Sequence, residues 1–283
     1  MSNMDKRLKK IIEYVLLILL ACIFIFPLIW MIASSMKPES EVYSDMGGIQ
    51  SMIPSLNPSD WFTTYQELFD RFNVLKYVFN SITYSIAVTA GSILINAMAG
   101  YAFAKFDFKG KKVLFGVLIA LLIVPVETLI ITQFTVAHDL GILNTRLAVI
   151  LPMIANMFFI YLFRNFFMAV PDEIIESVKL DGANYWTIFW RIVLPMSKPA
   201  IATVGTLSFI ASWNDYLWPL MVLTDSSKYP LQVAITNINS TPPVYTNQVM
   251  AILTISTIPL VIVYIIAQRY ILQGLGGSGT GIK

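Results

Sequence analysis

The sequence predicts an all-α membrane protein with six transmembrane helices and both termini in the cytoplasm. Three observations lead to this fold class: the composition, six long apolar runs, and the distribution of Lys and Arg between those runs. Of the 283 residues, 57% are hydrophobic and 13% are charged, whereas a soluble protein has about 25% charged residues. So few charges cannot cover a surface that faces water, and the apolar content is too high for a disordered chain. The composition therefore places most of the chain in a membrane.

Six apolar runs are long enough to cross about 30 Å of hydrocarbon, which takes about 20 residues. These runs are 11–33, 75–99, 113–134, 147–163, 200–222 and 249–267. The first run follows basic residues, as the core of a signal peptide does, but it continues past Cys22 and is too long for such a core. We therefore expect it to be an uncleaved transmembrane helix.

Lys and Arg are concentrated in alternate segments between the runs. If the N-terminus is cytoplasmic, the inside segments hold 14 of these residues and the outside segments hold five. Because cytoplasmic loops carry the excess of Lys and Arg, this distribution predicts that both termini are cytoplasmic.

The chain divides into three predicted parts. The segment 34–73 contains three prolines, a Gly-Gly pair and six acidic residues, which predicts an irregular external loop with one short helix near 61–69. We expect residues 1–72 to form an N-terminal transmembrane helix with this external loop. Residues 73–270 would form a five-helix core that includes a cytoplasmic loop at 169–199, and residues 271–283 would form a cytoplasmic tail.

The cytoplasmic loop after the fourth run is too long for a turn and contains its own helix signals. Pro171 suits the first position of a helix, and Asp172 suits its positively polarised end. Gly182 would end this helix, and Asn184 would cap a second one. Four acidic residues in the loop are matched by four basic ones only when Arg164, just before the loop, is counted with Lys179, Arg191 and Lys198. A helix pair resting on lipid headgroups would instead have a basic polar face. We therefore favour a docking surface for a protein partner and keep the lipid-resting pair as the alternative.

The same loop resembles the signature loop of the permease subunits of ABC importers. That signature is Glu-Ala-Ala, three residues, Gly, nine residues, Ile, one residue and Leu-Pro. The matching positions are Glu176, Gly182, Ile192, Leu194 and Pro195, and Ser177 and Val178 replace the two alanines. The segments DLGILNT at 139–145, FIASWNDYLWP at 209–219 and QRYILQGL at 268–275 are similar to the carbohydrate-uptake branch of the family, and within it to the second, shorter permease.

This resemblance covers most of the chain and implies a type I ABC importer permease fold. It implies a non-catalytic subunit that forms half of the pathway of an ATP-driven sugar importer, with an oligosaccharide favoured and glycerol phosphate or an acidic oligosaccharide as alternative solutes. The implied partners are a second permease, two ATPase subunits and an extracytoplasmic solute-binding protein, at a bacterial or archaeal cytoplasmic (inner) membrane. The residues that would couple to the ATPase are Glu173, Glu176, Ser177, Lys179, Asp181, Gly182 and Ala183.

The composition limits the chemistry that the chain itself could perform. It has one cysteine and one histidine, which excludes a disulfide framework, a cysteine-based zinc site and any site that needs two histidines. The net charge of +2 provides no basic surface of the kind that binds nucleic acid. The phosphate-binding motif Gly-x-x-x-x-Gly-Lys-Ser/Thr is also absent. We therefore expect no catalytic residues, metal or cofactor here, and expect ATP and Mg²⁺ to bind to the partner ATPase.

Polar residues inside the predicted spans are costly and mark candidate functional sites. The candidates for a substrate pathway are Glu127, Asn156, Trp213, Asn214 and Asp215. Asp and Asn side chains could bind sugar hydroxyls, and Trp rings could stack on sugar rings. Alternatively, Glu127 and Asp215 could relay ions in an ion-coupled secondary transporter, or these residues could be structural. A channel or a membrane scaffold remains a third class of function.

Overall fold

The computed structural model describes residues 3–44 and 47–276, and the side chains of residues 7–44 and 47–268. Within these residues all the regular elements are helical. The chain forms two compact units, which are described separately. The first unit contains the described residues up to Leu75 together with Ile235–Ile258, and the second contains Lys76–Ala234 and the described residues from Pro259 onward.

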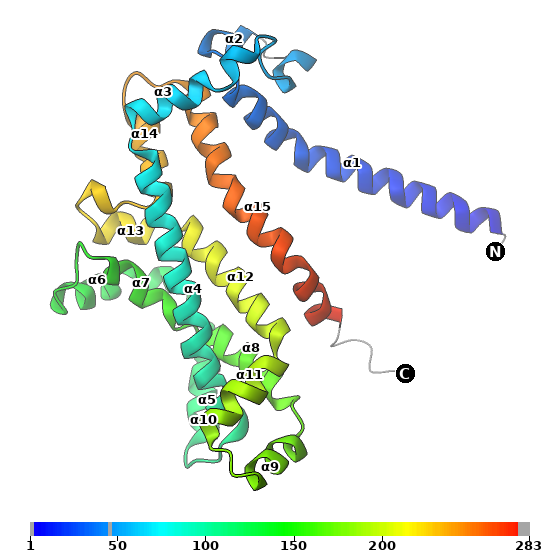
Figure 1. Cartoon of the computed structure of the whole chain (residues 1–283), viewed down its shortest axis with the longest axis vertical. Helices are drawn as coiled ribbons and strands as arrows, with labels where there is room; N and C mark the ends of the chain where they lie inside the picture. Colours follow the sequence, from blue (N-terminus) through cyan, green and yellow to red (C-terminus); the bar gives the residue numbers. More distant parts are fainter. Residues whose placement is uncertain (1–2, 45–46, 277–283) are drawn as a thin grey trace. The chain divides into compact units, whose positions relative to one another are not determined.

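The first unit contains one long apolar helix and several short ones. Its helices are α1 (Asn3–Ser35), α2 (Glu39–Ser44), η1 (Ile49–Met52), η2 (Pro58–Trp61) and α3 (Thr63–Arg71), and it includes the start of α15 (Thr246–Gly276). The predicted short helix near 61–69 is confirmed as α3, which lies across the start of α15 (Figure 1). The most apolar window of α1 buries no residue within the molecule. Lipid or another chain must therefore cover this helix in a membrane.

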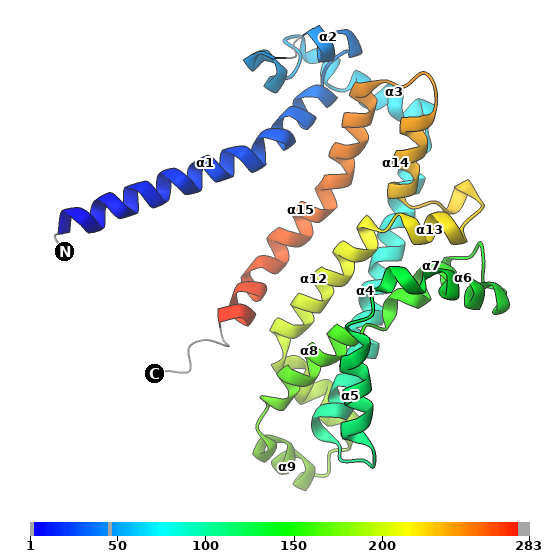
Figure 2. The same ribbon diagram turned by 180° about the vertical axis from the view of Figure 1, so that it is seen from behind.

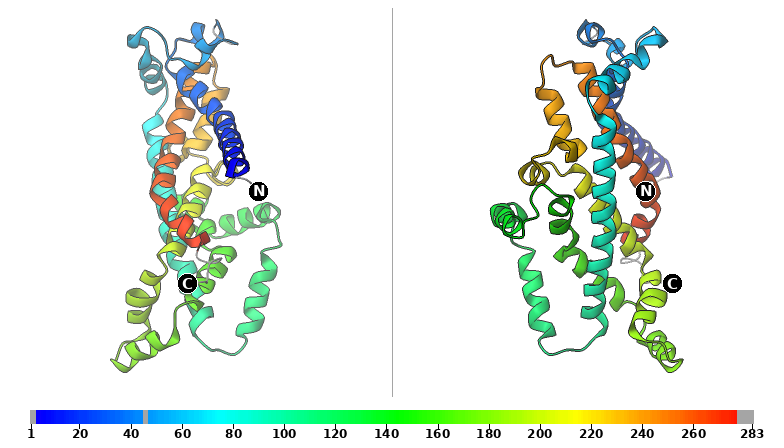
Figure 3. Two further views of the ribbon diagram at one scale, coloured as in Figure 1. Left: turned by 90° about the vertical axis from the view of Figure 1, so that its right-hand side faces the viewer. Right: turned by 60° about the vertical axis from the view of Figure 1, so that its left-hand side comes forward.

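The second unit contains the remaining helices. They are most of α4 (Val74–Lys105), then α5 (Lys111–Leu121), η3 (Val126–Leu129), α6 (Ile130–Asp139), α7 (Arg146–Ile154), α8 (Met157–Met168), α9 (Asp172–Leu180), α10 (Tyr185–Ile188), η4 (Phe189–Val193), α11 (Leu194–Met196), α12 (Lys198–Asn214), α13 (Leu217–Val222), η5 (Ser226–Lys228), the start of α14 (Leu231–Ser240) and the end of α15. After α4 the chain turns through Gly110, whose φ is +85°, and α5 returns antiparallel to α4 (Figure 3). At one end of the unit, α9 lies beyond α5 and α8 (Figure 2).

Three spans of the described chain are bent, although the sequence predicts six uninterrupted runs. Three helices are long and apolar enough to cross a membrane, and there are up to six spans if each bent pair of helices is one span. The pair Lys111–Leu121 and Val126–Asp139 is bent by 95°, at Pro125, which has no N–H to donate. The pair Arg146–Ile154 and Met157–Met168 is bent by 46°.

The third bent pair joins the loop at 169–199, which the sequence predicts to be cytoplasmic, to the fifth predicted span. The helices of Tyr185–Met196 and Lys198–Asn214 meet at 81°. The predicted run 200–222 is also interrupted, because α12 ends at Asn214 and α13 begins at Leu217. Hydropathy thus locates these spans but does not report the breaks within them.

Two close contacts position α4 against the fourth span. Gly100 on α4 faces α8, where a Cβ atom would lie 2.7 Å from Phe163 Cβ. The side chain of Asn96, which is fully buried, bridges the break between α7 and α8. Its Oδ1 accepts from the N–H of Asn156 at 2.9 Å, and its Nδ2 donates to the carbonyl of Ile154 at 3.0 Å. These bonds satisfy backbone groups that the break leaves without a helical partner.

The predicted tail 271–283 lies partly outside the described residues. Helix α15 continues to Gly276, so residues 271–276 are helical. Residues 277–283 lie outside the described part of the chain. The division into 1–72, 73–270 and 271–283 remains a prediction.

Candidate functional site

The loop predicted to be cytoplasmic forms the predicted helix–turn–helix, which we call the docking loop (residues 171–196). Helix α9 begins directly after Pro171. The chain reverses at Gly182, whose φ of +84° is accessible to glycine without steric cost. Asn184 caps α10, because its Oδ1 accepts from the N–H of Thr187 at 2.8 Å. The second helix continues through one π turn, η4, and extends to Met196. Local sequence signals therefore fix both the start and the reversal of this loop.

One face of the docking loop is buried in the hydrophobic core of the second unit. Ile175 of α9, Ile188 of α10 and Val193 of η4 are at most 5% exposed. They pack in one cluster with Phe163 and Phe167 of α8. This anchor holds the loop against α8.

The opposite face of the docking loop is exposed and carries the predicted coupling residues. The side chains of Glu173, Glu176, Ser177, Lys179 and Asp181 are exposed, Gly182 is exposed at the turn, and Ala183 is half-buried. Beside them, large apolar side chains are also uncovered: Leu180 is 89% exposed and Trp186 is 57% exposed. A mixed surface of acidic and large apolar side chains at the tip of a loop fits a protein partner.

A lysine that the sequence analysis did not single out holds the base of this loop. Lys105, the last residue of α4, donates from Nζ to Asp172 Oδ1 and to the carbonyl oxygen of Val170, both at 2.7 Å. Its side chain is 8% exposed, whereas that of Asp172 is 77% exposed. The hydrogen bond and the positive charge of Lys105 lower the pKa of Asp172 below its usual range. The only sign of this role in the sequence is that Lys105 follows a long apolar run that is predicted to be a helix.

The polar candidates in the predicted spans lie at helix breaks. Asn156 caps α8, and its Oδ1 accepts from the N–H groups of Phe158 at 2.9 Å and Phe159 at 3.3 Å. Asp215 lies between α12 and α13, where its Oδ1 accepts from the N–H of Trp218 at 3.4 Å. Capping the broken ends accounts for both side chains.

The other three candidates do not form one cluster with these two. Glu127 is exposed on η3, and Trp213 is 1% exposed and stacks on Phe209 with ring centroids 5.8 Å apart. Asn214 is exposed and accepts from Gln232 at 3.4 Å. Within the described side chains, no hydrogen bond or ion pair joins Glu127 to Asp215. The roles of all five residues in a substrate pathway remain predictions.

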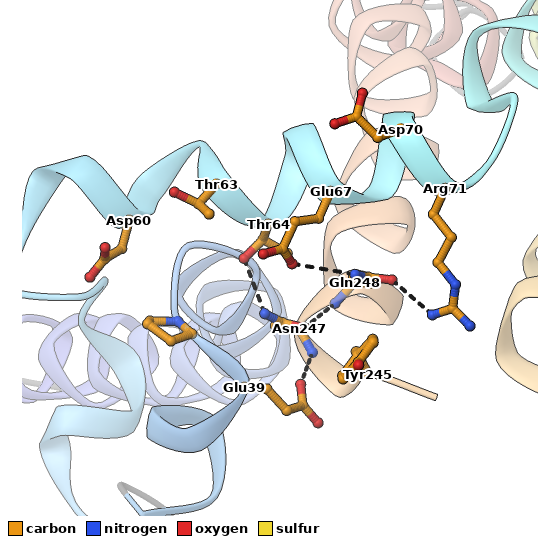
Figure 4. A pocket seen from close by; sticks show the side chains of 11 residues that line it. Glu39, Asp60, Thr63, Thr64, Glu67, Asp70, Arg71, Tyr245, Asn247 and Gln248 are labelled. Carbon is orange, nitrogen blue, oxygen red and sulfur yellow. Dashed lines mark hydrogen bonds between the residues drawn. The ribbon is translucent and has the colours of Figure 1, made fainter. Parts of the chain in front are cut away.

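A polar cavity of about 640 Å³ lies in the first unit, in the part of the chain predicted to be external (Figure 4). Its lining includes four acidic residues and one basic residue: Glu39, Asp60, Glu67, Asp70 and Arg71. The sequence analysis did not identify it, because it joins α2 and α3 to the start of α15 from distant parts of the sequence.

Hydrogen bonds within this cavity hold the start of α15. The carboxylate of Glu39 accepts from the N–H groups of Thr246 and Asn247, both at 2.9 Å. Arg71 donates to the carbonyl oxygens of Pro243 at 2.6 Å and Thr241 at 3.0 Å. These bonds cap the helix and close the turn before it. Among the described residues, no group of three or more His, Cys, Asp or Glu side chains could hold a metal ion.

Known proteins resemble this chain over most or nearly all of its length. The lactose transport system permease protein LacG of Rhizobium radiobacter is 30% identical over 98% of this chain and 99% of its own. The diacetylchitobiose uptake system permease protein NgcG of Streptomyces coelicolor is 31% identical over 99% of this chain and 91% of its own. The sn-glycerol-3-phosphate transport system permease protein UgpE of Yersinia pestis is 36% identical over 70% of this chain and 72% of its own.

A solved structure and a family pattern agree with these relatives. A chain of a bacterial ABC transporter involved in importing the acidic polysaccharide alginate superposes with a TM-score of 0.83 at 26% identity, over 96% of this chain and 99% of that one. Residues 92–277 match the family described as the binding-protein-dependent transport system inner membrane component. This match includes the docking loop, all three bent pairs and the part of α4 from residue 92 onward. The chain therefore belongs to the family of inner membrane components of binding-protein-dependent transport systems, the permease subunits of ABC importers.

Proposed function

We propose that this chain is a permease subunit of an ATP-driven importer of sugars and forms half of the translocation pathway. Relatives named for lactose and diacetylchitobiose, each similar over nearly the whole chain, support a sugar, with an oligosaccharide favoured. The relative named for glycerol 3-phosphate and the structure from an alginate importer support glycerol phosphate and an acidic oligosaccharide as alternative solutes.

The docking loop is the observation that carries this proposal. It combines a buried face, which anchors it to α8, with an exposed face of acidic and large apolar side chains. The exposed face would bind an ATPase subunit, and Glu173, Glu176, Ser177, Lys179, Asp181, Gly182 and Ala183 would form the contact. ATP and Mg²⁺ would bind to that partner, and the present chain would have no catalytic role.

The other proposed partners follow from the remaining surfaces. A second permease subunit, together with membrane lipid, would cover α1, whose apolar window has no buried residue. An extracytoplasmic solute-binding protein would approach the segment that contains the acidic cavity, because the Lys and Arg distribution places this segment outside. The whole assembly would lie in a bacterial or archaeal cytoplasmic membrane, with both termini of this chain inside.

An ion-coupled secondary transporter has less support. It would need Glu127 and Asp215 to act together, but Glu127 is exposed on η3 and Asp215 caps α13. A structural role explains Asp215 without an ion. The two carboxyl groups also belong to different bent spans.

The proposal can be tested by reconstituting the chain in liposomes with its second permease, its ATPase and its solute-binding protein. ATP hydrolysis and solute uptake would be measured with lactose, diacetylchitobiose, an acidic oligosaccharide and glycerol 3-phosphate. We expect one of the sugars to stimulate ATP hydrolysis and to accumulate only when ATP is present. Accumulation driven by a proton or sodium gradient without the ATPase would contradict the proposal.

A further inference from the structure

The end of α4 is attached to both helices of the docking loop. Lys105 Nζ bonds to the carbonyl of Val170 and the carboxylate of Asp172, the residues on either side of Pro171 at the start of α9. Because the lysine side chain is 8% exposed whereas that of Asp172 is 77% exposed, breaking these bonds would leave the ammonium group of Lys105, and not the carboxylate, short of hydrogen-bond partners. The first helix of the docking loop is therefore fixed to α4.

An aromatic contact attaches the second helix of the loop to the same end of α4. Tyr101 lies one helical turn before Lys105, and its ring centroid is 5.2 Å from that of Phe189 in η4. The ring of Phe106, directly after α4, meets the ring of Tyr185 in α10 edge-to-face at 4.9 Å. Aromatic pairs at these separations favour defined orientations.

The same helix is attached to the break in the fourth span. Asn96 precedes Lys105 by nine residues, which is about 13.5 Å along an α-helix. Asn96 binds the carbonyl oxygen of Ile154, the last residue of α7, and the N–H of Asn156, which caps α8. One continuous helix thus connects the base of the docking loop to a bend of 46°.

We propose that Lys105 is a positioning residue that transmits movement of the docking loop to α4 and, through Asn96, to the break between α7 and α8. This inference rests on the proposed function, in which an ATPase moves the docking loop. A force on α9 would otherwise reach α4 only through apolar and aromatic packing and through the chain that joins α9 to α8. The hydrogen bonds of Lys105 add a directional link to a stiff helix.

The first experiment compares two lysines of one small cavity in the reconstituted complex. Lys105→Met removes the link, and Lys111→Met is the matched control, because Lys111 lines the same cavity but bonds only to Phe106 and Asp107 beside it. The measurement is the ratio of solute molecules transported to ATP molecules hydrolysed. We expect this ratio to fall about two- to thirtyfold in Lys105→Met, as is typical of mutations along coupled networks. It should stay near wild type in Lys111→Met and in Lys105→Arg, which keeps the charge and the donors.

A second variant covers the case in which Lys105→Met fails to fold. Asp172→Asn changes an exposed side chain and leaves α4 intact, and it should lower the transport ratio in the same direction. An unchanged ratio in both Asp172→Asn and a folded Lys105→Met would overturn the inference. Failure of the wild-type complex to couple ATP hydrolysis to uptake would instead count against the proposed function.

A third measurement reports directly on the break between α7 and α8. In a Cys22→Ser background, Met157→Cys places a fluorescent label at the first residue of α8. ATP should change the emission of this label in the otherwise wild-type complex and in Lys111→Met, and the change should be lost in Lys105→Met. A merely structural lysine would leave the ATP-induced change intact, and that result would also overturn the inference.

Discussion

Replacing Gly100 by alanine should destabilise the protein through one added methyl group. Gly100 lies on α4 where this helix packs against α8. An added Cβ would lie 2.7 Å from Phe163 Cβ, 3.0 Å from the backbone nitrogen of Arg164 and 3.1 Å from the carbonyl oxygen of Ile160. Two of these atoms belong to helical backbone, so the contact can be relieved only if the helices separate.

The expected cost follows from the packing of this contact. Phe163 is fully buried in the core of the second unit, and overpacking such a site costs about 1–3 kcal/mol. The matched control is Gly116→Ala on α5, where an added Cβ would meet no atom within 4 Å. There, alanine should be neutral or stabilise the helix by about 1 kcal/mol or less.

Thermal unfolding of the purified full chain in detergent, followed by circular dichroism, measures both variants. In a chain of somewhat smaller size, each kcal/mol of lost stability lowers the unfolding temperature by about 2–4 °C. Gly100→Ala should therefore unfold about 2–12 °C below wild type. Gly116→Ala should unfold at or slightly above the wild-type temperature. Equal unfolding temperatures for the two variants would refute the close approach of α4 and α8 as the reason that position 100 is glycine.

Four further predictions concern single side chains. Glu176→Lys reverses a charge on the exposed face of α9 and should abolish co-purification with the ATPase or solute-stimulated ATP hydrolysis; retention of both would count against the docking assignment. Asp215→Asn should weaken uptake if this residue lines a sugar pathway, whereas unchanged uptake kinetics would assign it to capping alone. Asn96→Leu should lower the free energy of unfolding by about 1–3 kcal/mol for each backbone group that it leaves unpaired, measurable by thermal unfolding. Finally, Lys105 lowers the pKa of Asp172. The stability that this pair contributes is therefore complete above the unfolded pKa of Asp172 and is lost only as the pH falls through the lower folded pKa. Uptake coupling that changed between pH 8 and pH 5 in wild type but not in Asp172→Asn would contradict this.

The docking loop could be predicted in detail because its signals are local. Pro171, Gly182 and Asn184 each act on backbone groups within a few residues of themselves. The fixed φ of Pro171, the positive φ of Gly182 and the side-chain cap of Asn184 depend little on the rest of the fold. The sequence also indicated the exposed acidic face, because the matching Glu176 stands in a recognisable pattern.

The interruptions in the spans could not be predicted in the same way. Hydropathy measures whether a segment suits lipid, and a bent pair of helices suits lipid as well as a straight one if its free backbone groups find partners. For the fourth span, those partners come from Asn96, which is 60 residues from Asn156 in the sequence. Asn156 itself is a candidate pathway residue in the sequence and a helix cap in the structure.

The sequence by itself indicated that this chain spans a membrane, and it predicted the direction in which the chain is oriented and which loop presents a docking face. Those properties depend on sums over many residues and on local backbone preferences, both of which can be read along the chain. Only the tertiary structure decided that Lys105 holds the base of the docking loop, 67 residues away at Asp172. It also decided that Glu39 and Arg71, which line one cavity, hold the start of α15 and the turn before it. These contacts depend on which helices become neighbours, because a hydrogen bond forms only when packing brings donor and acceptor within about 3 Å.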